Sequence, residues 1–153
     1  MATIDEVKDC LQGYDIEVLE FDRDTPTSET AAAAVGCSVA QIAKSMLLLV
    51  GGSPLLVVAS GDVKVKSSLL KQAAGLTGKV RFPDPETVRE QTGYAPGGVC
   101  PFLLPKGVPV FIDASLRRFT TVYPAAGNDR SAVPITVDLL LQLTGGTETT
   151  VCT

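Results

Sequence analysis

The sequence predicts an α+β protein built on a mixed, largely antiparallel, barrel-like β-sheet with surrounding helices. Two apolar runs, residues 42–50 and 55–60, are joined by Gly51-Gly52-Ser53-Pro54, which is typical of an antiparallel hairpin. The predicted strands cluster, and helices are spaced irregularly among them, which favours this class over a doubly wound parallel sheet. With 153 residues, of which 45% are hydrophobic, the chain is expected to form one domain over residues 1–153.

The N-terminal part is predicted to form two helices and a strand. Residues 3–12 carry apolar side chains at helical spacing and are followed by Gly13. Residues 16–21 alternate apolar and acidic side chains, which indicates a strand. Ser28 is expected to cap an alanine-rich helix over residues 29–35.

The part after the hairpin is predicted to alternate short helices and strands. Glycine stops and the Asp84-Pro85 helix start delimit the helices, whereas apolar runs mark the strands. The predicted helices are 66–74, 85–91 and 137–143, and the predicted strands are 79–82, 108–113, 119–123 and 133–135. The threonine-rich C-terminal tail is expected to fray.

The composition excludes several kinds of site. The chain has no histidine, so Ser-His-Asp and Cys-His catalysis and histidine-rich metal sites are excluded. A net charge of −4 argues against indiscriminate nucleic-acid binding, although a local patch could still contact part of an RNA. The four cysteines form no C-x-x-C pair, so free thiols and no metal or cofactor are expected.

The apolar segments are all too short to span a membrane, and the first residues form no basic, apolar leader. A cytoplasmic protein without a membrane partner is therefore expected.

The segment Thr92–Pro101 is the most informative motif. Gly93, Gly97 and Gly98 allow a ligand to approach the backbone closely, and the prolines stiffen the loop. Its backbone N–H groups could bind a carbonyl oxygen or a phosphate. A tight connection between a helix and the next strand is an equally good interpretation. The loop is neither a Walker A motif nor a dinucleotide-binding fingerprint.

Lys44 interrupts the apolar run of the first hairpin strand. A buried amine is costly, so the side chain must reach a cleft or solvent. Spacing alone favours an edge lysine whose stem lies on the core.

Three further positions have two interpretations each. Cys100 is either a nucleophile without a histidine partner or a small residue packed behind the loop. Asp113 ends a strand, where it either faces a cleft or caps the turn at Ala114-Ser115. Ala126-Gly127 allows close ligand approach or a simple bend.

A basic cluster, Lys64, Lys66, Lys71, Lys79 and Arg81, is typical of a solvated face. It is also the best candidate for contacts with RNA phosphates.

These motifs together resemble the YbaK/ProX family of aminoacyl-tRNA deacylases, which is related to the editing domain inserted in bacterial prolyl-tRNA synthetases. The resemblance covers about residues 25–144. The matching segments, in order, are Ser28-Glu29-Thr30-Ala31, Gln41-Ile42-Ala43-Lys44-Ser45-Met46, Thr92-Gly93-Tyr94, Gly97-Gly98-Val99-Cys100-Pro101, Val110-Phe111-Ile112-Asp113 and Ala126-Gly127.

The resemblance implies hydrolysis of the ester between tRNA and a wrong amino acid, on tRNA(Pro) carrying Ala, Cys or Ser. Lys44 would hold the terminal adenosine end, and backbone amides of the glycine loop would bind the aminoacyl carbonyl. Water, or the thiol of a cysteinyl substrate, would attack. The expected catalytic set is Lys44, Gly97, Gly98, Val99, Cys100 and Pro101. The expected substrate-binding set is Thr30, Ser45, Asp113, Ala126 and Gly127.

The implied partner is the 3′ end of an aminoacyl-tRNA. Association with prolyl-tRNA synthetase, and the choice between monomer and homodimer, stay open. Cys100 replaces a serine that is common in relatives, which leaves the amino-acid specificity open. The alternative function is a non-catalytic module that binds an aminoacyl-adenosine or tRNA end, and loss of turnover in Lys44→Ala would argue against it.

Overall fold

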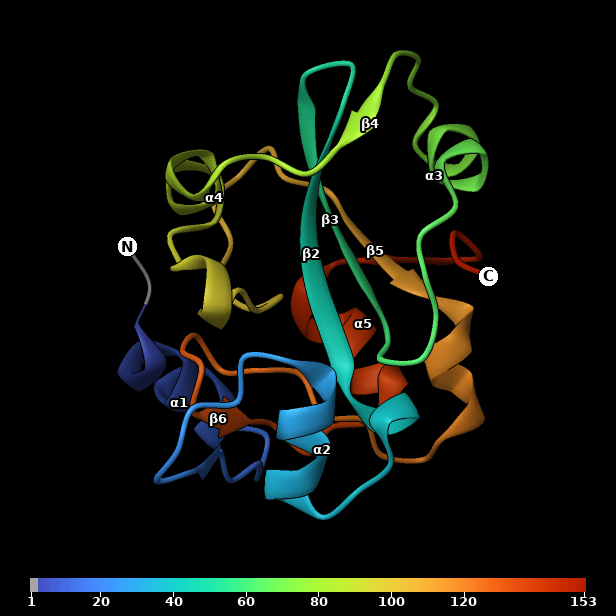
Figure 1. Ribbon diagram of the computed structural model, residues 1–153. Helices are drawn as coiled ribbons and strands as arrows, with labels where there is room; N and C mark the ends of the chain where they lie inside the picture. The colour runs from blue at the N-terminus through green and yellow to red at the C-terminus, as the bar shows by residue number, and fades with distance from the viewer. Residues whose placement is uncertain (1–2) are drawn as a thin grey trace.

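The computed structural model describes residues 3–153, and its centre is a five-stranded mixed sheet in the order β4-β2-β3-β5-β7 (Figure 1). The strands are β2 (Ala43–Val50), β3 (Ser53–Ser60), β4 (Val80–Arg81), β5 (Val110–Asp113) and β7 (Thr147–Thr149). β2 pairs antiparallel with β3 and β4, whereas β5 runs parallel to β3 and β7. The predicted α+β class and the predicted hairpin are confirmed. The sheet does not close between its edge strands β4 and β7, so it is not a barrel.

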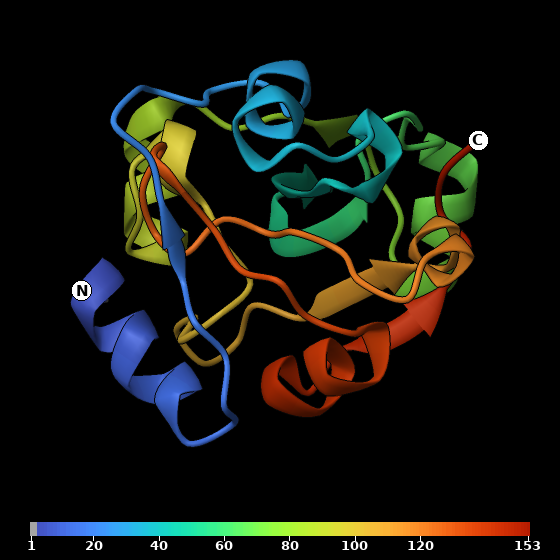
Figure 2. The same ribbon diagram turned by 90° about the horizontal axis from the view of Figure 1, so that it is seen from below.

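Helices cover both faces of this sheet. They are α1 (Ile4–Gln12), α2 (Ser28–Val35), α3 (Ser67–Ala74), α4 (Pro85–Thr92) and α5 (Val137–Thr144), with single 3-10 turns η1 (Val39–Gln41), η2 (Pro96–Gly98) and η3 (Ala114–Arg118). Leu11 of α1, Val88 of α4 and Leu140 of α5 bury one face, and α1 and α5 lie side by side beneath it (Figure 2). Leu70 of α3 packs on the opposite face together with Val151.

The first residue of the alanine-rich helix is not its cap. Thr27, rather than Ser28, is the N-cap, because Thr27 and Thr30 exchange side-chain and backbone hydrogen bonds in a capping box. The side chain of Ser28 is therefore free of the capping role that was predicted for it.

The strands predicted over 119–123 and 133–135 are wrong. These segments meet only through an isolated bridge between Val122 and Ile135, because Pro124 and Pro134 supply no N–H to a ladder. The regular pairing here is instead the two-stranded sheet of β1 (Leu19–Glu20) and β6 (Ser131–Ala132).

The C-terminal tail is ordered in the fold and does not fray. β7 extends the sheet beside β5, and Val151 and Cys152 are buried. The carboxylate of Asp113 accepts hydrogen bonds from the N–H groups of Val151 and Cys152, at 2.8 and 3.1 Å. These contacts hold the tail against the end of β5.

The first half of β2 has an open edge. β4 pairs only with Leu49 and Val50, at the far end of the strand. Before β2 begins, Ile42 makes a bridge to Tyr123. Between these points, no other strand in residues 3–153 pairs with β2 on the side away from β3. The candidate site lies along this edge.

Candidate functional site

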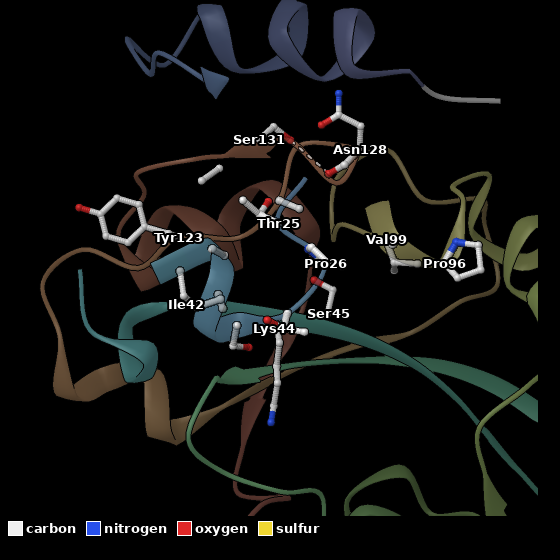
Figure 3. Close-up of a pocket in the computed structure, with 17 residues that line it drawn as sticks. Thr25, Pro26, Ile42, Lys44, Ser45, Pro96, Val99, Tyr123, Asn128 and Ser131 are labelled. Atoms are coloured by element: carbon white, nitrogen blue, oxygen red, sulfur yellow. Dashed lines mark hydrogen bonds between the residues drawn. The ribbon is translucent and has the colours of Figure 1, made fainter. Parts of the chain in front are cut away.

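A small pocket lies where four segments of the chain meet at the start of β2 (Figure 3). Its volume is about 120 Å³, far below the ~300 Å³ at which drug-sized ligand pockets begin. The lining residues come from the end of the loop before α2 and α2 itself (Thr25, Pro26, Thr27, Ser28, Ala31), from Ile42 and the start of β2 (Ala43, Lys44, Ser45), from the glycine loop (Pro96, Gly97, Val99) and from residues 123–132 (Tyr123, Ala125, Asn128, Ser131, Ala132).

Backbone hydrogen bonds hold two of these walls together. Thr25 donates both its N–H and its hydroxyl to the carbonyl of Asp129, at 2.6 and 2.8 Å. The Ser131 hydroxyl accepts from the N–H of Ala126 at 3.0 Å and lies 3.4 Å from the carbonyl of Asn128, the contact drawn in Figure 3. The polar groups of this wall are thus fixed by the fold before any ligand binds.

The glycine loop packs directly on the turn at residues 127–128. A methyl group at Gly98 would lie 2.6 Å from Cα of Asn128 and 2.9 Å from the carbonyl oxygen of Gly127. The N–H of Gly98 is used internally, because it donates to the carbonyl of Ala95 at 2.8 Å. Gly98 is therefore the residue that lets the loop close onto the neighbouring turn.

Gly97 and Val99 are the pocket-lining residues of the loop that carry an N–H group, since the third, Pro96, has none. Within residues 3–153, the N–H groups of these two residues have no backbone acceptor. They are consequently the amides of the loop that are left without a backbone partner at the pocket.

Ser45 lines the pocket and carries an unpartnered hydroxyl. Its Oγ atom is buried and has no hydrogen-bond partner within residues 3–153. A buried hydroxyl without a partner costs about 1–3 kcal/mol. Because Ser45 also lines the pocket, a ligand there is one source of the missing partner.

Lys44 lies beside the pocket, but its amine does not point into it. Side chains alternate along β2, so Lys44 projects to the face opposite Ser45, away from the other labelled residues in Figure 3. Its Nζ donates to the carbonyl of Val63. Main-chain atoms of Lys44 border the pocket, and its side chain lines a second hollow of about 370 Å³ on the other face.

Cys100 and Pro101 lie behind the loop rather than in the pocket. Both are buried, and the Cys100 Sγ lies 3.9 Å from the carbonyl oxygen of Phe102. Burial raises the pKa of the Cys100 thiol to about 11, so the thiolate is scarce at neutral pH. These observations favour the packing interpretation of Cys100 over the nucleophile interpretation.

Four of the predicted substrate-binding residues do not line the pocket. Thr30 caps α2, and Ala126 is fully buried. Gly127 adopts φ 107°, and a methyl group there would lie 3.0 Å from the ring of Tyr94. Asp113 is 2% exposed and caps the turn at Ser115 as well as holding the tail, which matches the turn-cap interpretation. Ser45 alone of the predicted substrate-binding set faces the pocket.

Several lining residues were not predicted from the sequence. Thr25, Tyr123, Asn128 and Ser131 contribute polar atoms, and each stands next to or within a few residues of a predicted position. The signal available for Asn128 and Ser131 was the cluster of polar residues that follows the Ala126-Gly127 bend.

No group of three or more His, Cys, Asp or Glu side chains in residues 3–153 is arranged to hold a metal ion. Across the same residues, every helix is too short or too polar to cross a membrane.

The geometry defines a class of protein: an α+β domain with a small, pre-formed pocket whose polar groups are backbone amides and hydroxyls. The matching family model is that of the aminoacyl-tRNA editing domain, and it covers residues 22–143. The chain therefore belongs to the aminoacyl-tRNA editing domain family.

Individual relatives agree with this assignment. The chain is 42% identical over 121 residues to the uncharacterized protein YwhH of Bacillus subtilis. The aligned segment covers 78% of this chain and 76% of YwhH. It is 33% identical over 135 residues to the proline–tRNA ligase of Bacillus licheniformis, covering 82% of this chain but only 22% of that enzyme.

A solved structure, described as a candidate trans-editing enzyme for prolyl tRNA synthetase, superposes with a TM-score of 0.86 at 31% identity. The superposition covers 98% of this chain and 96% of the chain in that structure.

Proposed function

We propose that this protein is a trans-editing hydrolase that removes a small, wrongly attached amino acid from tRNA, with Ala, Cys or Ser on tRNA(Pro) as the substrates. Membership of the editing-domain family supports a role on aminoacyl-tRNA. The similarity to a proline–tRNA ligase and to a structure described for prolyl tRNA synthetase supports tRNA(Pro). The observation that carries the proposal is the unpartnered Ser45 hydroxyl in a small pocket beside the glycine loop.

In this proposal the aminoacyl ester enters the pocket with its carbonyl oxygen toward the N–H groups of Gly97 and Val99. Water adds to the carbonyl carbon, and the charge that develops on the oxygen is stabilised by these amides. A fixed donor aimed at such an oxyanion is worth about 2.7–4 kcal/mol, or 10²–10³ in kcat. The 3′ oxygen of the ribose then leaves with a proton, which yields free amino acid and deacylated tRNA.

In this proposal the Ser45 hydroxyl binds a polar atom of the aminoacyl group or of the attacking water. Catalysis in this site relies on pre-arranged donors, because the lining contains no carboxylate and no histidine. Pre-arranged dipoles need no reorganisation as the charge develops.

Selection among amino acids would depend on the size of the pocket. Ala31, Ala125 and Ala132 line it with single methyl groups. Larger substrate side chains would collide with these walls, while one methylene more or less changes binding by about 1–3 kcal/mol.

The test is deacylation of Ala-, Cys-, Ser- and Pro-tRNA(Pro) by the wild-type protein and by Ser45→Ala. Ser60→Ala is the matched control, because Ser60 Oγ is also buried and unpartnered but lies outside the pocket. Both variants are expected to be as stable as wild type or more stable, since each removes an unsatisfied hydroxyl. Only Ser45→Ala should lose turnover, by about tenfold.

Two results would contradict the proposal. Equal turnover of Ser45→Ala and Ser60→Ala would show that the Ser45 hydroxyl takes no part in catalysis. Failure of the wild-type protein to release any of the four amino acids, while it still binds the charged tRNAs, would favour the non-catalytic binding module.

A further inference from the structure

We propose that the open edge of β2 and the basic groove beyond it bind the single-stranded 3′ end of the RNA where it leaves the pocket. In this arrangement Phe82 stacks on a base, and Lys64 and Arg81 contact phosphates. The inference rests on the proposed function, because that function places the 3′-terminal ester in the pocket.

Three hollows follow one another along the β2 edge. The pocket shares Ser45, Pro96 and Val99 with a middle hollow, which is also lined by Met46, Leu47, Phe82, Pro83 and Val88. The middle hollow and the outer groove share Met46 and Phe82. The three hollows therefore adjoin one another along the edge of β2, which is the path we assign to the RNA.

The outer groove has a concentrated positive charge in an acidic protein. It is lined by Lys44, Lys64 and Arg81 and by no carboxylate, although the net charge of the chain is −4. A cationic groove on an acidic protein attracts a polyanion to that region of its surface.

The groove cations differ from three arginines elsewhere on the surface. Arg117, Arg118 and Arg130 each form an ion pair with a carboxylate. Within residues 3–153, Lys64 and Arg81 form none, and both are exposed. The carboxylate nearest to Arg81 in sequence, that of Asp84, accepts from the N–H of Thr87 at 2.8 Å and caps α4. The one nearest to Lys64, that of Asp62, pairs with Arg118 at 2.6 Å. The charges of the groove are thus available to a ligand.

Phe82 supplies the second element of a single-strand binding site. It is 69% exposed, more than Tyr14 at 43% or Leu103 at 45%, the other large hydrophobic residues that are exposed in residues 3–153. It directly follows β4 and precedes Pro83, so its backbone is held on both sides. An exposed aromatic ring beside unpaired cations is the combination that binds unpaired bases and their phosphates.

Lys44 joins the two ends of this path. Its main chain borders the pocket while its amine lies in the groove. A terminal nucleotide whose ester is in the pocket would lie across the β2 edge, with its phosphate on the side of that amine. This placement reconciles the role expected for Lys44 with an amine that points away from the pocket.

The first experiment measures binding of a fluorescein-labelled, unacylated RNA hairpin that ends in a single-stranded CCA. Phe82→Ala, Lys64→Gln and Arg81→Gln are compared with wild type at several salt concentrations. Phe82→Ala should weaken binding about tenfold, and Phe82→Tyr should restore it. Each cation variant should reduce the slope of log K against log salt by about one.

The matched controls lie on the exposed loop after the glycine motif. Leu103→Ala removes an exposed apolar side chain, and Lys106→Gln removes an exposed cation, both away from the groove. These two variants should bind the hairpin as wild type does. Wild-type affinity in Phe82→Ala and Arg81→Gln would overturn the inference. So would equal losses in the two controls, or tight binding of the same hairpin without its single-stranded end.

A hydrolysis assay separates this inference from the proposed function. On charged tRNA, Phe82→Ala should raise KM about tenfold and leave kcat unchanged. On an aminoacyl-adenosine, which is too short to reach the groove, it should hydrolyse as wild type does. If no charged tRNA is hydrolysed and the variants still weaken hairpin binding, the deacylase function fails while the groove stands. If charged tRNA is hydrolysed and the variants bind the hairpin as wild type does, the deacylase function stands while the groove inference fails.

Discussion

Gly98→Ala tests whether the contact between the glycine loop and the turn at residues 127–128 sets the geometry of the pocket. The new methyl group would lie 2.6 Å from Cα of Asn128 and 2.9 Å from the carbonyl oxygen of Gly127. Ordinary carbon–carbon contacts are about 3.5–4.0 Å, so the loop and the turn must separate by about 1 Å. Both neighbouring atoms belong to the backbone and cannot rotate away. Overpacking of this kind costs about 1–3 kcal/mol of unfolding free energy.

The displacement should affect catalysis more than stability. A shift of ~1 Å in positioning groups can lower the rate about 10²-fold. We expect Tm to fall by about 3 °C for each kcal/mol lost, and kcat to fall about 100-fold under conditions where the variant is folded. Thermal unfolding and single-turnover deacylation measure the two effects.

Gly97→Ala is the control for this prediction. Its methyl group would be 3.5 Å from Cβ of Asp129, which is an ordinary contact, so Tm should be unchanged or slightly raised. The reasoning would be refuted if Gly98→Ala were as stable as Gly97→Ala.

Three further outcomes are expected. Asp113→Asn should lower the unfolding free energy by about 1–3 kcal/mol in urea titrations without changing kcat of the folded fraction, because the carboxylate accepts hydrogen bonds only from the backbone. Burial raises the pKa of the Cys100 thiol from 9.0 to about 11, so the unfolded thiol ionises first and stability should fall as pH rises from 9 to 11. Cys100→Ser should lessen that fall by about 1 kcal/mol per pH unit and keep its activity at pH 7; a steeper fall, or loss of turnover, would contradict the packing role. Ala125→Val should lower kcat/KM for Cys-tRNA(Pro) more than for Ala-tRNA(Pro), and equal losses would argue against selection by size.

Local sequence signals predicted the elements whose formation depends on neighbouring residues. The hairpin of β2 and β3 followed from two apolar runs around a glycine turn, and α4 followed from Asp84 and Pro85 at its start. The errors fell on segments that depend on distant partners. β7 has no apolar pattern of its own and forms because β5 offers a parallel edge.

The same division applies to the candidate site. The glycine loop and Ser45 were predicted from motifs in the sequence, and both face the pocket. The sequence could not assign separate tasks to Gly97 and Gly98, because only the turn at residues 127–128 makes one a lining residue and the other a packing residue.

The sequence by itself determined the class of fold, the absence of histidine chemistry and the family motifs around Lys44 and the glycine loop. The tertiary structure decided which side of β2 forms the pocket, and therefore on which side the side chains of Lys44 and Ser45 lie. A strand alternates its side chains, so Ser45 faces the pocket while the amine of Lys44 lies on the other face. β4 pairs only with the last two residues of β2, so the edge of the first half of β2 stays open. No local sequence pattern indicates where such a pairing ends.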